Sequence, residues 1–447
     1  MSTERSSPSV LIVGAGIGGL LLAILFERSN IPYHIYEQAA QVRPLGAALT
    51  VGGNILPVFE QLGLLEEIES ISLPCHSIDI YNGRQDKLGS IVLEGHRLVT
   101  GYDSLIFERP KFHDILRRQV PDHKISMNKK VLRTTEKDGK VTLHCADGTT
   151  YEGDILVGAD GAYSNIRQNM YKKMDEQGLL PKSDLEGFNV GYITTVGVAY
   201  PQNPGKYPQL AENISHFSSN IGENNQTWTV VTTADKSICW GVSIQLPKAR
   251  VMERQYQNSE WSAESNEAML ADFRDKVCPW GGTMGEIIDA TPKDRITKFF
   301  LEEKVFKTWH HGHTVLIGDA CHKMLPSAGQ GAVNAMQDAV VLANCLHNMT
   351  DSSTSNIKAA FQEYYRQRFD RATMQGERSR TWTKIISGHT WVERFIRHLM
   401  LNYVPFWLLH RIAISMYEYR PQIAWLPLAQ ERGTERALPQ EGRKDTH

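Results

Sequence analysis

The pattern of apolar and polar residues begins with an uncharged run from Val10 to Phe26 that four glycines interrupt. The start of this run is typical of a buried strand, and residues 17–29 predict a helix that follows the glycines directly. A second apolar stretch at residues 33–36 then ends at an acidic residue, Glu37. The order strand, glycines, helix, strand and acid predicts the start of an α/β nucleotide-binding domain.

The pattern up to residue 161 alternates short strands and helices. It predicts strands at 76–82 and 89–95, a helix at 109–120, and two strands joined by an Asp-Gly turn within 140–161. We expect Phe112, Ile115 and Leu116 to share the buried face of the helix at 109–120. Asn54, after a glycine-rich loop, is expected to cap the helix that follows it.

The pattern changes near residue 186. Alternating apolar residues up to about residue 300 predict an antiparallel sheet, after which a buried strand and long helices return. The predicted fold class is α/β, with a Rossmann-like domain interrupted by an antiparallel β-sheet substrate domain and followed by a helical tail. The expected divisions are 1–185 and 301–385 for the nucleotide domain, with strands near 75–105 joining the substrate sheet, 186–300 for the β-rich insert, and 386–447 for the tail.

Composition narrows the class of protein. The chain has 447 residues, 41% of them hydrophobic, and a formal charge of -2, so no strong positive field attracts nucleic acid. The six cysteines have no C-x-x-C spacing, which argues against a zinc site and a disulfide framework and favours a cytoplasmic location. The amino-terminal stretch lacks the basic region and cleavage site of a signal peptide, so neither export nor a membrane span is expected.

The first glycines have the spacing of a dinucleotide fingerprint. Gly14 allows a tight turn, Gly16 lets a pyrophosphate approach the backbone, and Gly19 lets helix and strand pack closely. Free amides at the helix start face the phosphates, and Glu37 can accept hydrogen bonds from a ribose hydroxyl. A lone G-x-G-x-x-G is weak evidence, and the motif does not separate NAD from FAD.

Three further motifs carry polar residues that an α/β core does not require. Arg109 begins a helix and either faces a phosphate or lies on the surface. Asp160, within "GADGAYSNIR", either contacts a ligand or forms an ordinary aspartate turn before a capped helix. Asp319 ends a buried strand, where a carboxylate is costly unless it accepts hydrogen bonds, for example from a polyol or as a simple helix cap. We expect His322, close to Asp319, to be a core histidine.

Taken in order, these motifs resemble those of the class A FAD-dependent monooxygenases, the single-component aromatic hydroxylases. The resemblance covers roughly residues 8–385 and is strongest to the fungal, salicylate-hydroxylase-like enzymes of secondary metabolism. It implies that FAD is bound by Gly14, Gly16, Gly19, Glu37, Gly46, Ala48, Arg109, Asp160, Asp319, Pro326, Gly329, Gly331 and Ala332. The sequence has Gly46-Ala47-Ala48 where the family often has Gly-Ala-Gly, and Gln337 where it often has glutamate.

The resemblance also implies an activity. NADPH or NADH would reduce FAD, and O2 would then form a flavin C4a-hydroperoxide that hydroxylates or epoxidises an apolar aromatic or isoprenoid-type small molecule. No second nucleotide fingerprint is present, so the pyridine nucleotide is expected to visit without a Rossmann domain of its own. A reductase or oxidase that does not insert oxygen, and an FAD-binding redox protein without turnover, remain alternatives.

The substrate residues and the tail stay open at this stage. Four aromatic residues of the insert, Tyr192, Phe217, Trp228 and Trp240, either pack in a core or line an apolar pocket, and no catalytic residue can be assigned. In the tail, Trp391, Phe395 and Leu399 share one helical face. Residues 391–418 therefore either pack against the nucleotide domain as a lid or make peripheral contact with a membrane surface.

Overall fold

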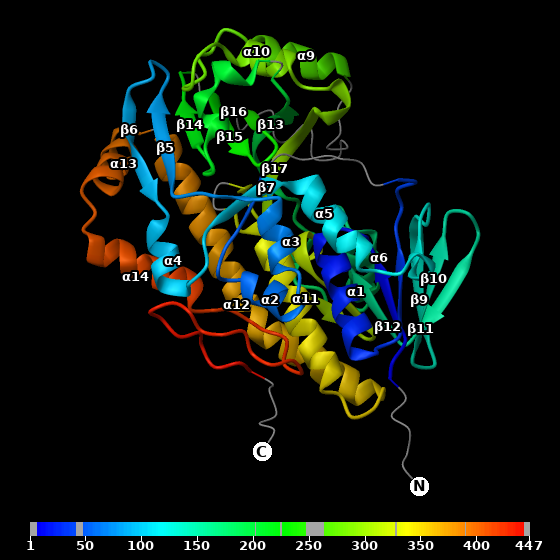
Figure 1. Ribbon diagram of the computed structural model, residues 1–447. Coiled ribbons are helices and arrows are strands. Elements are labelled where there is room, and N and C mark those ends of the chain that lie inside the picture. The colour runs from blue at the N-terminus through cyan, green and yellow to red at the C-terminus, as the bar shows by residue number, and fades with distance from the viewer. Residues whose placement is uncertain are drawn as a thin grey trace.

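The computed structural model describes residues 7–41, 48–201, 203–223, 226–246, 263–326, 329–388 and 390–441. Within these ranges, strands form a six-stranded sheet, an eight-stranded sheet and two three-stranded sheets. Helices cover the six-stranded sheet and continue into the carboxyl-terminal region (Figure 1). This arrangement confirms the predicted α/β fold class with a helical tail.

The six-stranded sheet carries the dinucleotide fingerprint. Its order is β18 (His310–His311), β19 (Thr314–Leu316), β12 (Ile155–Gly158), β1 (Val10–Val13), β2 (Tyr33–Tyr36) and β8 (Ile125–Ser126). All neighbours pair in parallel except β18 and β19. Because parallel strands place their carboxyl ends at one edge, the loops after β1, β2, β12 and β19 lie together.

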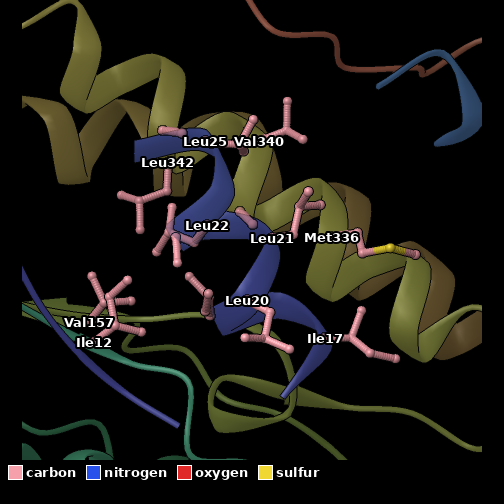
Figure 2. Packing of buried hydrophobic residues seen from close by; sticks show 14 of the residues in the cluster. Ile12, Ile17, Leu20, Leu21, Leu22, Leu25, Val157, Met336, Val340 and Leu342 are labelled. Atoms are coloured by element: carbon pink, nitrogen blue, oxygen red, sulfur yellow. The ribbon is translucent and has the colours of Figure 1, made fainter. Parts of the chain in front are cut away.

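Helix α1 (Ile17–Ser29) explains the uncharged run at the amino terminus. Residues 17–26 of this helix are all buried, so it needs apolar residues on every side. Figure 2 shows Ile12 and Val157 of the six-stranded sheet on one side of α1, and Met336 and Val340 of helix α11 (Gly331–His347) on another. The run is therefore the central strand and helix of the core, in agreement with the expectation that it spans no membrane.

The eight-stranded sheet lies beside this core. Its order is β20 (His322–Lys323), β17 (Thr297–Val305), β13 (Asn189–Ala199), β16 (Ser237–Gln245), β15 (Gln226–Thr233), β14 (Phe217–Ile221), β5 (Ser77–Asn82) and β6 (Lys87–Val92). The pairing is antiparallel except between β14 and β5, which are parallel. Two segments remote in sequence, 77–92 and 189–245, are thus joined in one sheet.

The two smaller sheets have three strands each. One is β11 (Thr150–Gly153), β10 (Lys140–Cys145) and β9 (Val131–Lys137), and the other is β3 (Ala48–Val51), β7 (Leu105–Glu108) and β4 (Leu73–Pro74). The second of these places β7 directly before helix α5 (Arg109–Arg118). Phe112, Ile115 and Leu116 are buried on one face of α5, as the pattern predicts.

The remaining helices have these bounds: α2 (Leu56–Gln61), α3 (Leu65–Ser70), α4 (Glu94–Thr100), α6 (Asn165–Glu176), α7 (Lys182–Leu185), α9 (Ala263–Ala271), α10 (Met284–Asp289), α12 (Thr354–Ser387), α13 (Trp391–Asn402) and α14 (Phe406–Tyr417). Helices α9 and α10 lie over the eight-stranded sheet, and α13 and α14 lie at the side of the molecule near α4 and β6 (Figure 1). None of the helices in the described ranges is long and apolar enough to cross a membrane.

Candidate functional site

Strand ends that are remote in sequence meet at one edge of the six-stranded sheet. The amide of Ala159, after β12, donates to the carbonyl of Val13 at 2.8 Å, and the amide of Ile317, after β19, donates to the carbonyl of Gly158 at 3.0 Å. The fingerprint loop and the motifs around residues 160 and 319 are therefore neighbours in space. This is the position at which α/β sheets of this kind bind ligands.

The three fingerprint glycines differ in what surrounds them. Gly14 has φ +108, and a Cβ there would lie 2.3 Å from the carbonyl oxygen of Ala159. A Cβ at Gly19 would lie 2.2 Å from the carbonyl oxygen of Gly14. Nothing lies within 4 Å of a Cβ built on Gly16. Packing thus requires Gly14 and Gly19, whereas Gly16 leaves the backbone open to a ligand.

Glu37, at the end of β2, is tied to the same loop. Its Oε2 accepts a hydrogen bond from the amide of Ala15 at 2.8 Å, and its Oε1 accepts one from the amide of Ala39 at 2.8 Å. A carboxylate has about four acceptor positions, so each oxygen can accept a further bond. Glu37 therefore holds the fingerprint loop in place and can still receive a hydroxyl group.

Helix α5 brings Arg109 to this edge. His113, one turn after Arg109, has its Nε2 2.8 Å from the carbonyl oxygen of Ala15 in the fingerprint loop. Burial lowers the pKa of Arg109, and the nearby carboxylate of Asp319 opposes this shift. The face of α5 that carries Arg109 and His113 is therefore turned toward the fingerprint loop and Asp319, although the Arg109 side chain is still exposed to solvent.

The loop after β12 contains a carboxylate that is only partly satisfied. Oδ2 of Asp160 accepts a hydrogen bond from the amide of Ile166 at 3.2 Å, whereas the buried Oδ1 has no hydrogen-bond partner among the described residues. Burial raises the pKa of Asp160. Ser164 caps α6, because its side chain accepts from the amide of Arg167 at 2.9 Å. The helix cap is thus present, and Asp160 bonds to the first turn of α6 while its Oδ1 stays available to a donor.

Arg167 joins two loops of the site. Its guanidinium donates to the carbonyl of Ala320 at 2.8 Å and to that of Ala162 at 2.7 Å. It lies over the ring of Phe306 at 4.1 Å from the centroid. A buried arginine held by two carbonyls and an aromatic face clamps the loop after β12 to the loop after β19. The sequence indicates the residue but not this role.

Asp319 departs from the expectation that it is buried. Its side chain is 41% exposed, and Nζ of Lys323 lies 3.6 Å from its Oδ2. It lies in a short 3-10 helix, Gly318–Ala320, without a side-chain cap. The backbone remains in the core on both sides of this residue, since Ile317, Ala320 and Cys321 are buried, and only the side chain of Asp319 reaches solvent. Its carboxylate is therefore available at the open edge of the site.

The glycine-rich segment before α11 leaves backbone amides available. Gly329 has φ +62, and its amide donates to the carbonyl of Pro326 at 2.8 Å. Helix α11 begins at Gly331 without a side-chain cap, and nothing lies within 4 Å of a Cβ built there. The amides of Gly331 and Ala332 therefore belong to a helix start that favours negative charge. Ala48 begins β3, whereas Gly46 lies outside the described residues.

Asn54 has a different function from the predicted one. Helix α2 begins at Leu56 after Ile55 and has no side-chain cap, so the expectation that Asn54 caps it is wrong. The buried Nδ2 of Asn54 instead donates to Oε1 of Gln330 at 3.2 Å, and its carbonyl accepts from Gln337 at 3.1 Å. Asn54 thus anchors the segment before α11. A residue 276 positions away in sequence supplies its partner, which no local pattern can reveal.

A buried charge network fixes the loop that follows β19. Asp338 on α11 accepts from Arg368 at 2.8 Å, from His322 at 2.6 Å, and from the amide of Gly318 at 2.9 Å. Burial alone would raise the pKa of Asp338, but His322 and Arg368 lower it to about 2. His322 is a core histidine, as expected, and the network fixes the loop that carries Asp319.

The same network contains three potential metal ligands, Cys321, His322 and Asp338, within 4.8 Å of one another. Burial raises the pKa of Cys321 well above its ordinary value, and its sulfur lies 3.4 Å from the carbonyl oxygen of Gly318. The oxygens of Asp338 already accept from Arg368, His322 and Gly318. These contacts make the three side chains part of a buried structural network.

Strand register divides the four aromatic residues of the insert. Trp228 and Trp240 are buried in one cluster with Val230, Val242 and other residues on the side of α10. Phe217 lies on the opposite face, where it packs against a separate cluster that includes Val198 and Cys239. The two tryptophans are therefore core residues.

Tyr192 and its neighbours belong to the other face of the sheet. Its hydroxyl lies 3.3 Å from Oγ of Ser387 at the end of α12. Further along this face, Val196 pairs with Gly241, and Gly241 pairs with Thr229, and all three are only half-buried. Small side chains therefore occupy the middle of the face that the aromatic residues Tyr192 and Phe217 border.

A family model described as "FAD binding domain" matches residues 7–375. The chain belongs to this FAD-binding family. Among curated relatives, the FAD-dependent monooxygenase andE of Emericella variicolor is 30% identical over 84% of this chain and 79% of its own length. The FAD-dependent monooxygenase ausM of Penicillium brasilianum is 29% identical over 96% of this chain and 90% of its own length. The protein is thus an FAD-dependent monooxygenase.

Solved structures agree with this fold. Klebsiella pneumoniae HpxO, complexed with FAD and uric acid, aligns with a TM-score of 0.73 at 22% identity, over 92% of this chain and 96% of that one. A salicylate hydroxylase substrate complex aligns with a TM-score of 0.67 at 22% identity, over 94% of this chain and 100% of that one. Both likenesses concern the fold.

The residues of the monooxygenase fit FAD. Among the described residues, nothing fills the space beside Gly16 and nothing donates to Oδ1 of Asp160. The carboxylate of Asp319 is exposed and can accept further hydrogen bonds. A dinucleotide needs open backbone amides at its phosphates and acceptors at its hydroxyl groups. All three features lie along the one edge of the sheet where β1, β12 and β19 end.

Proposed function

We propose that FAD lies across the strand ends and is held by the residues that the sequence singles out. Gly14, Gly16 and Gly19 would receive the pyrophosphate, Glu37 the adenosine ribose, and Arg109 the diphosphate or ribityl region. Asp160 and Asp319 would accept hydrogen bonds from the flavin half. The remaining contacts are assigned to Gly46, Ala48, Pro326, Gly329, Gly331 and Ala332. The observation that carries this proposal is the convergence of Gly16, Asp160 and Asp319 on one edge.

When bound, FAD supplies electron transfer from NADPH or NADH and the activation of O2. The chain contributes binding and electrostatics. The amides of Gly331 and Ala332, at the positive end of α11, would stabilise negative charge on the reduced ring. The eight-stranded sheet would cover the ring and exclude water. No second dinucleotide fingerprint is present in the sequence, which supports a visiting pyridine nucleotide.

We infer that the substrate is an apolar aromatic or isoprenoid-type small molecule that is hydroxylated or epoxidised. Support comes from the face of the eight-stranded sheet that carries Tyr192 and Phe217, with small residues between them. An apolar pocket with few polar groups suits such a ligand. We also propose a division of the chain into an FAD-binding part at 1–185 and 301–385, a substrate part at 186–300, and a tail at 386–447.

One experiment tests the activity directly. Purified protein with bound FAD is given NADPH or NADH, 18O2 and a panel of aromatic and isoprenoid compounds, and the product is analysed by mass spectrometry. One 18O atom in the product, with substrate-dependent oxidation of the pyridine nucleotide, is expected. A product without label would identify a reductase or oxidase instead. An Asp319→Asn variant should bind FAD about tenfold more weakly, because a charged acceptor is lost.

We further propose that α13 and α14 contact a membrane surface. Large apolar side chains of these helices and of the residue that follows α13 are exposed: Trp391, Val392, Phe395, Ile396, Leu399, Tyr403, Trp407, Leu409 and Ile412. Helix α13 is attached by polar groups, since Arg397 donates to the carbonyl of Ile386 at 2.6 Å and Asn402 donates to that of Leu88 at 2.9 Å. Exposed aromatic residues interspersed with arginines suit the interface of an anionic bilayer.

Vesicle sedimentation tests this contact. The protein is expected to bind vesicles that contain phosphatidylserine, and high salt is expected to release part of the bound protein. A variant with Trp391→Ser and Phe395→Ser should remain in the supernatant. Equal binding of both proteins would contradict the proposal, and a concentration-dependent dimer that the double variant abolishes would assign the surface to a second copy. The six free cysteines support a reducing compartment, so we place the protein at the cytoplasmic side.

A further inference from the structure

A buried carboxylate next to Arg109 has no place in the functions described above. Glu108 is the last residue of β7 and precedes α5, and its side chain is only 1% exposed. Its neighbour Arg109 faces the fingerprint loop and Asp319, whereas Glu108 points to the eight-stranded sheet. A buried carboxylate is costly unless it is well paired, so its partners indicate what it does.

Four side chains surround this carboxylate. Oε1 accepts from Nζ of Lys111 at 2.8 Å and from Oγ of Ser237 at 2.8 Å. Oε2 accepts from the hydroxyl of Tyr200 at 3.0 Å, and the guanidinium of Arg295 lies 3.7 Å away. We call these five residues the Glu108 cluster.

The cluster joins two parts of the molecule. Ser237 begins β16, Tyr200 follows β13, and Arg295 precedes β17, so three partners come from the eight-stranded sheet or its connections. Lys111 comes from α5 and also pairs with Asp235 in the turn before β16. The carboxylate of Glu108 therefore fastens the start of α5 to the sheet that covers the site.

We propose that Glu108 is a positioning residue: the Glu108 cluster fixes the start of α5 against the eight-stranded sheet and thereby holds Arg109 at the cofactor. The inference rests on the proposed contact between Arg109 and FAD. Glu108 and Arg109 are joined by one peptide bond. Contacts that hold the side chain of Glu108 therefore also fix the backbone from which the Arg109 side chain extends. The position of the eight-stranded sheet is thus linked to the contact between Arg109 and FAD.

A double-mutant cycle tests this role. Glu108→Gln keeps the shape of the side chain but removes its charge. One carboxylate oxygen is replaced by an NH2 group, which cannot accept hydrogen bonds from the donors that surround it. We expect the Kd for FAD to rise about tenfold, since one charge-assisted contact is lost and its donors are left unpaired. In an Arg109→Ala background the same Glu108→Gln change should leave the Kd unchanged, because the residue acts through Arg109.

The controls separate positioning from simple stabilisation. Asp79→Asn alters another carboxylate of the same sheet, one that pairs with Lys87 at 2.9 Å and accepts from Ser90 at 2.7 Å, and it should not change FAD affinity. Thermal unfolding of the apoprotein is measured for each variant. If Glu108→Gln does not fold, Ser237→Ala and Tyr200→Phe each remove one contact, and the cycle is run with them.

The outcomes are distinct. Additive effects of the Glu108 and Arg109 changes on the Kd, or a fall in unfolding temperature with an unchanged Kd, would overturn the positioning role. If Arg109→Ala alone leaves FAD binding unchanged, the proposed assignment of Arg109 itself is wrong. Substrate turnover gives a further readout, because a displaced Arg109 should lower kcat and raise the fraction of reducing equivalents released as H2O2.

Discussion

Two helices of similar length, α1 and α13, use apolar residues in opposite ways. Helix α1 is apolar on every side, and its residues 17–26 are all buried. Helix α13 alternates apolar and charged residues, none of its residues is buried, and Trp391 is 76% exposed. The helix that resembles a membrane segment in sequence is the centre of the core, and the helix that resembles a core helix presents its apolar face outward.

The difference shows that apolar content does not decide where a helix lies. Helix α1 is enclosed by the six-stranded sheet and α11, so each of its faces finds apolar partners. Helix α13 is attached by hydrogen bonds from Arg397 and Asn402 and by Leu401, which lies against Gly89. A capping box formed by Thr390 and Glu393 stabilises its start locally. Of the two alternatives for this segment, a lid would not be packed through Trp391, Phe395 and Leu399, because that face is exposed.

The largest effect should come from breaking the charge network beneath α11. Arg368→Leu leaves Asp338 buried without its guanidinium, which should cost about 3–5 kcal/mol of unfolding free energy. Chemical denaturation monitored by circular dichroism measures the change. The matched control is Arg411→Leu on the exposed side of α14, which should change stability by less than about 0.5 kcal/mol. A small effect at Arg368 would show that the network is replaceable.

A matched pair of leucines tests the comparison itself. Leu22→Ala on α1 creates a cavity in the closed core and should cost about 2–5 kcal/mol. Leu399→Ala on α13 removes the same atoms from an exposed position and should cost less than about 0.5 kcal/mol. Both values come from urea unfolding curves with unchanged slopes. Equal losses would mean that α13 is covered in solution, and the contrast between the two helices would fail.

Acid should weaken the buried region selectively. The pKa of Asp338 is lowered from 3.8 to about 2 by His322 and Arg368. A carboxylate with a lowered pKa stabilises the fold above its ordinary pKa, and this stability is lost as the pH falls through the folded value. About 2 kcal/mol should disappear between about pH 4 and pH 2. Unfolding curves over this range should show a shallower pH dependence in Asp338→Asn.

The smallest effect on stability is expected at the exposed face. Trp391→Ser should change the unfolding free energy by less than about 0.5 kcal/mol, because its side chain is 76% exposed. Its binding to phosphatidylserine vesicles should nevertheless decrease severalfold, since an interfacial tryptophan contributes buried apolar area. If Trp391→Ser lowers stability but leaves vesicle binding unchanged, the face of α13 that carries Trp391 is packed in the fold and is not a membrane contact.

Local patterns predicted the elements of the core well. The expected helix at residues 17–29 has the same bounds as α1, because a clear apolar pattern follows glycines at its start. Residues whose partners are far away in sequence were harder. Asn54 was expected to be a helix cap, and its contact with Gln330 depends on how α2 and α11 meet.

The pattern around Arg109 shows the same limit. The sequence indicates an arginine at a helix start but leaves a surface role equally open. The position of His113 against Ala15 decides that this face of α5 is turned toward the fingerprint loop. The role proposed for Glu108 is invisible in the sequence, because its partners lie at residues 111, 200, 237 and 295.

The sequence by itself determined the strand and helix of the fingerprint, the order of the glycine motifs and the family, since each depends on neighbouring residues and on local backbone geometry. Only the tertiary structure decided which face of α13 is exposed, that Trp228 and Trp240 belong to a core, and which groups surround Glu108. The physical reason is that burial and pairing depend on contacts between remote segments, and local periodicity specifies a face without specifying what covers it.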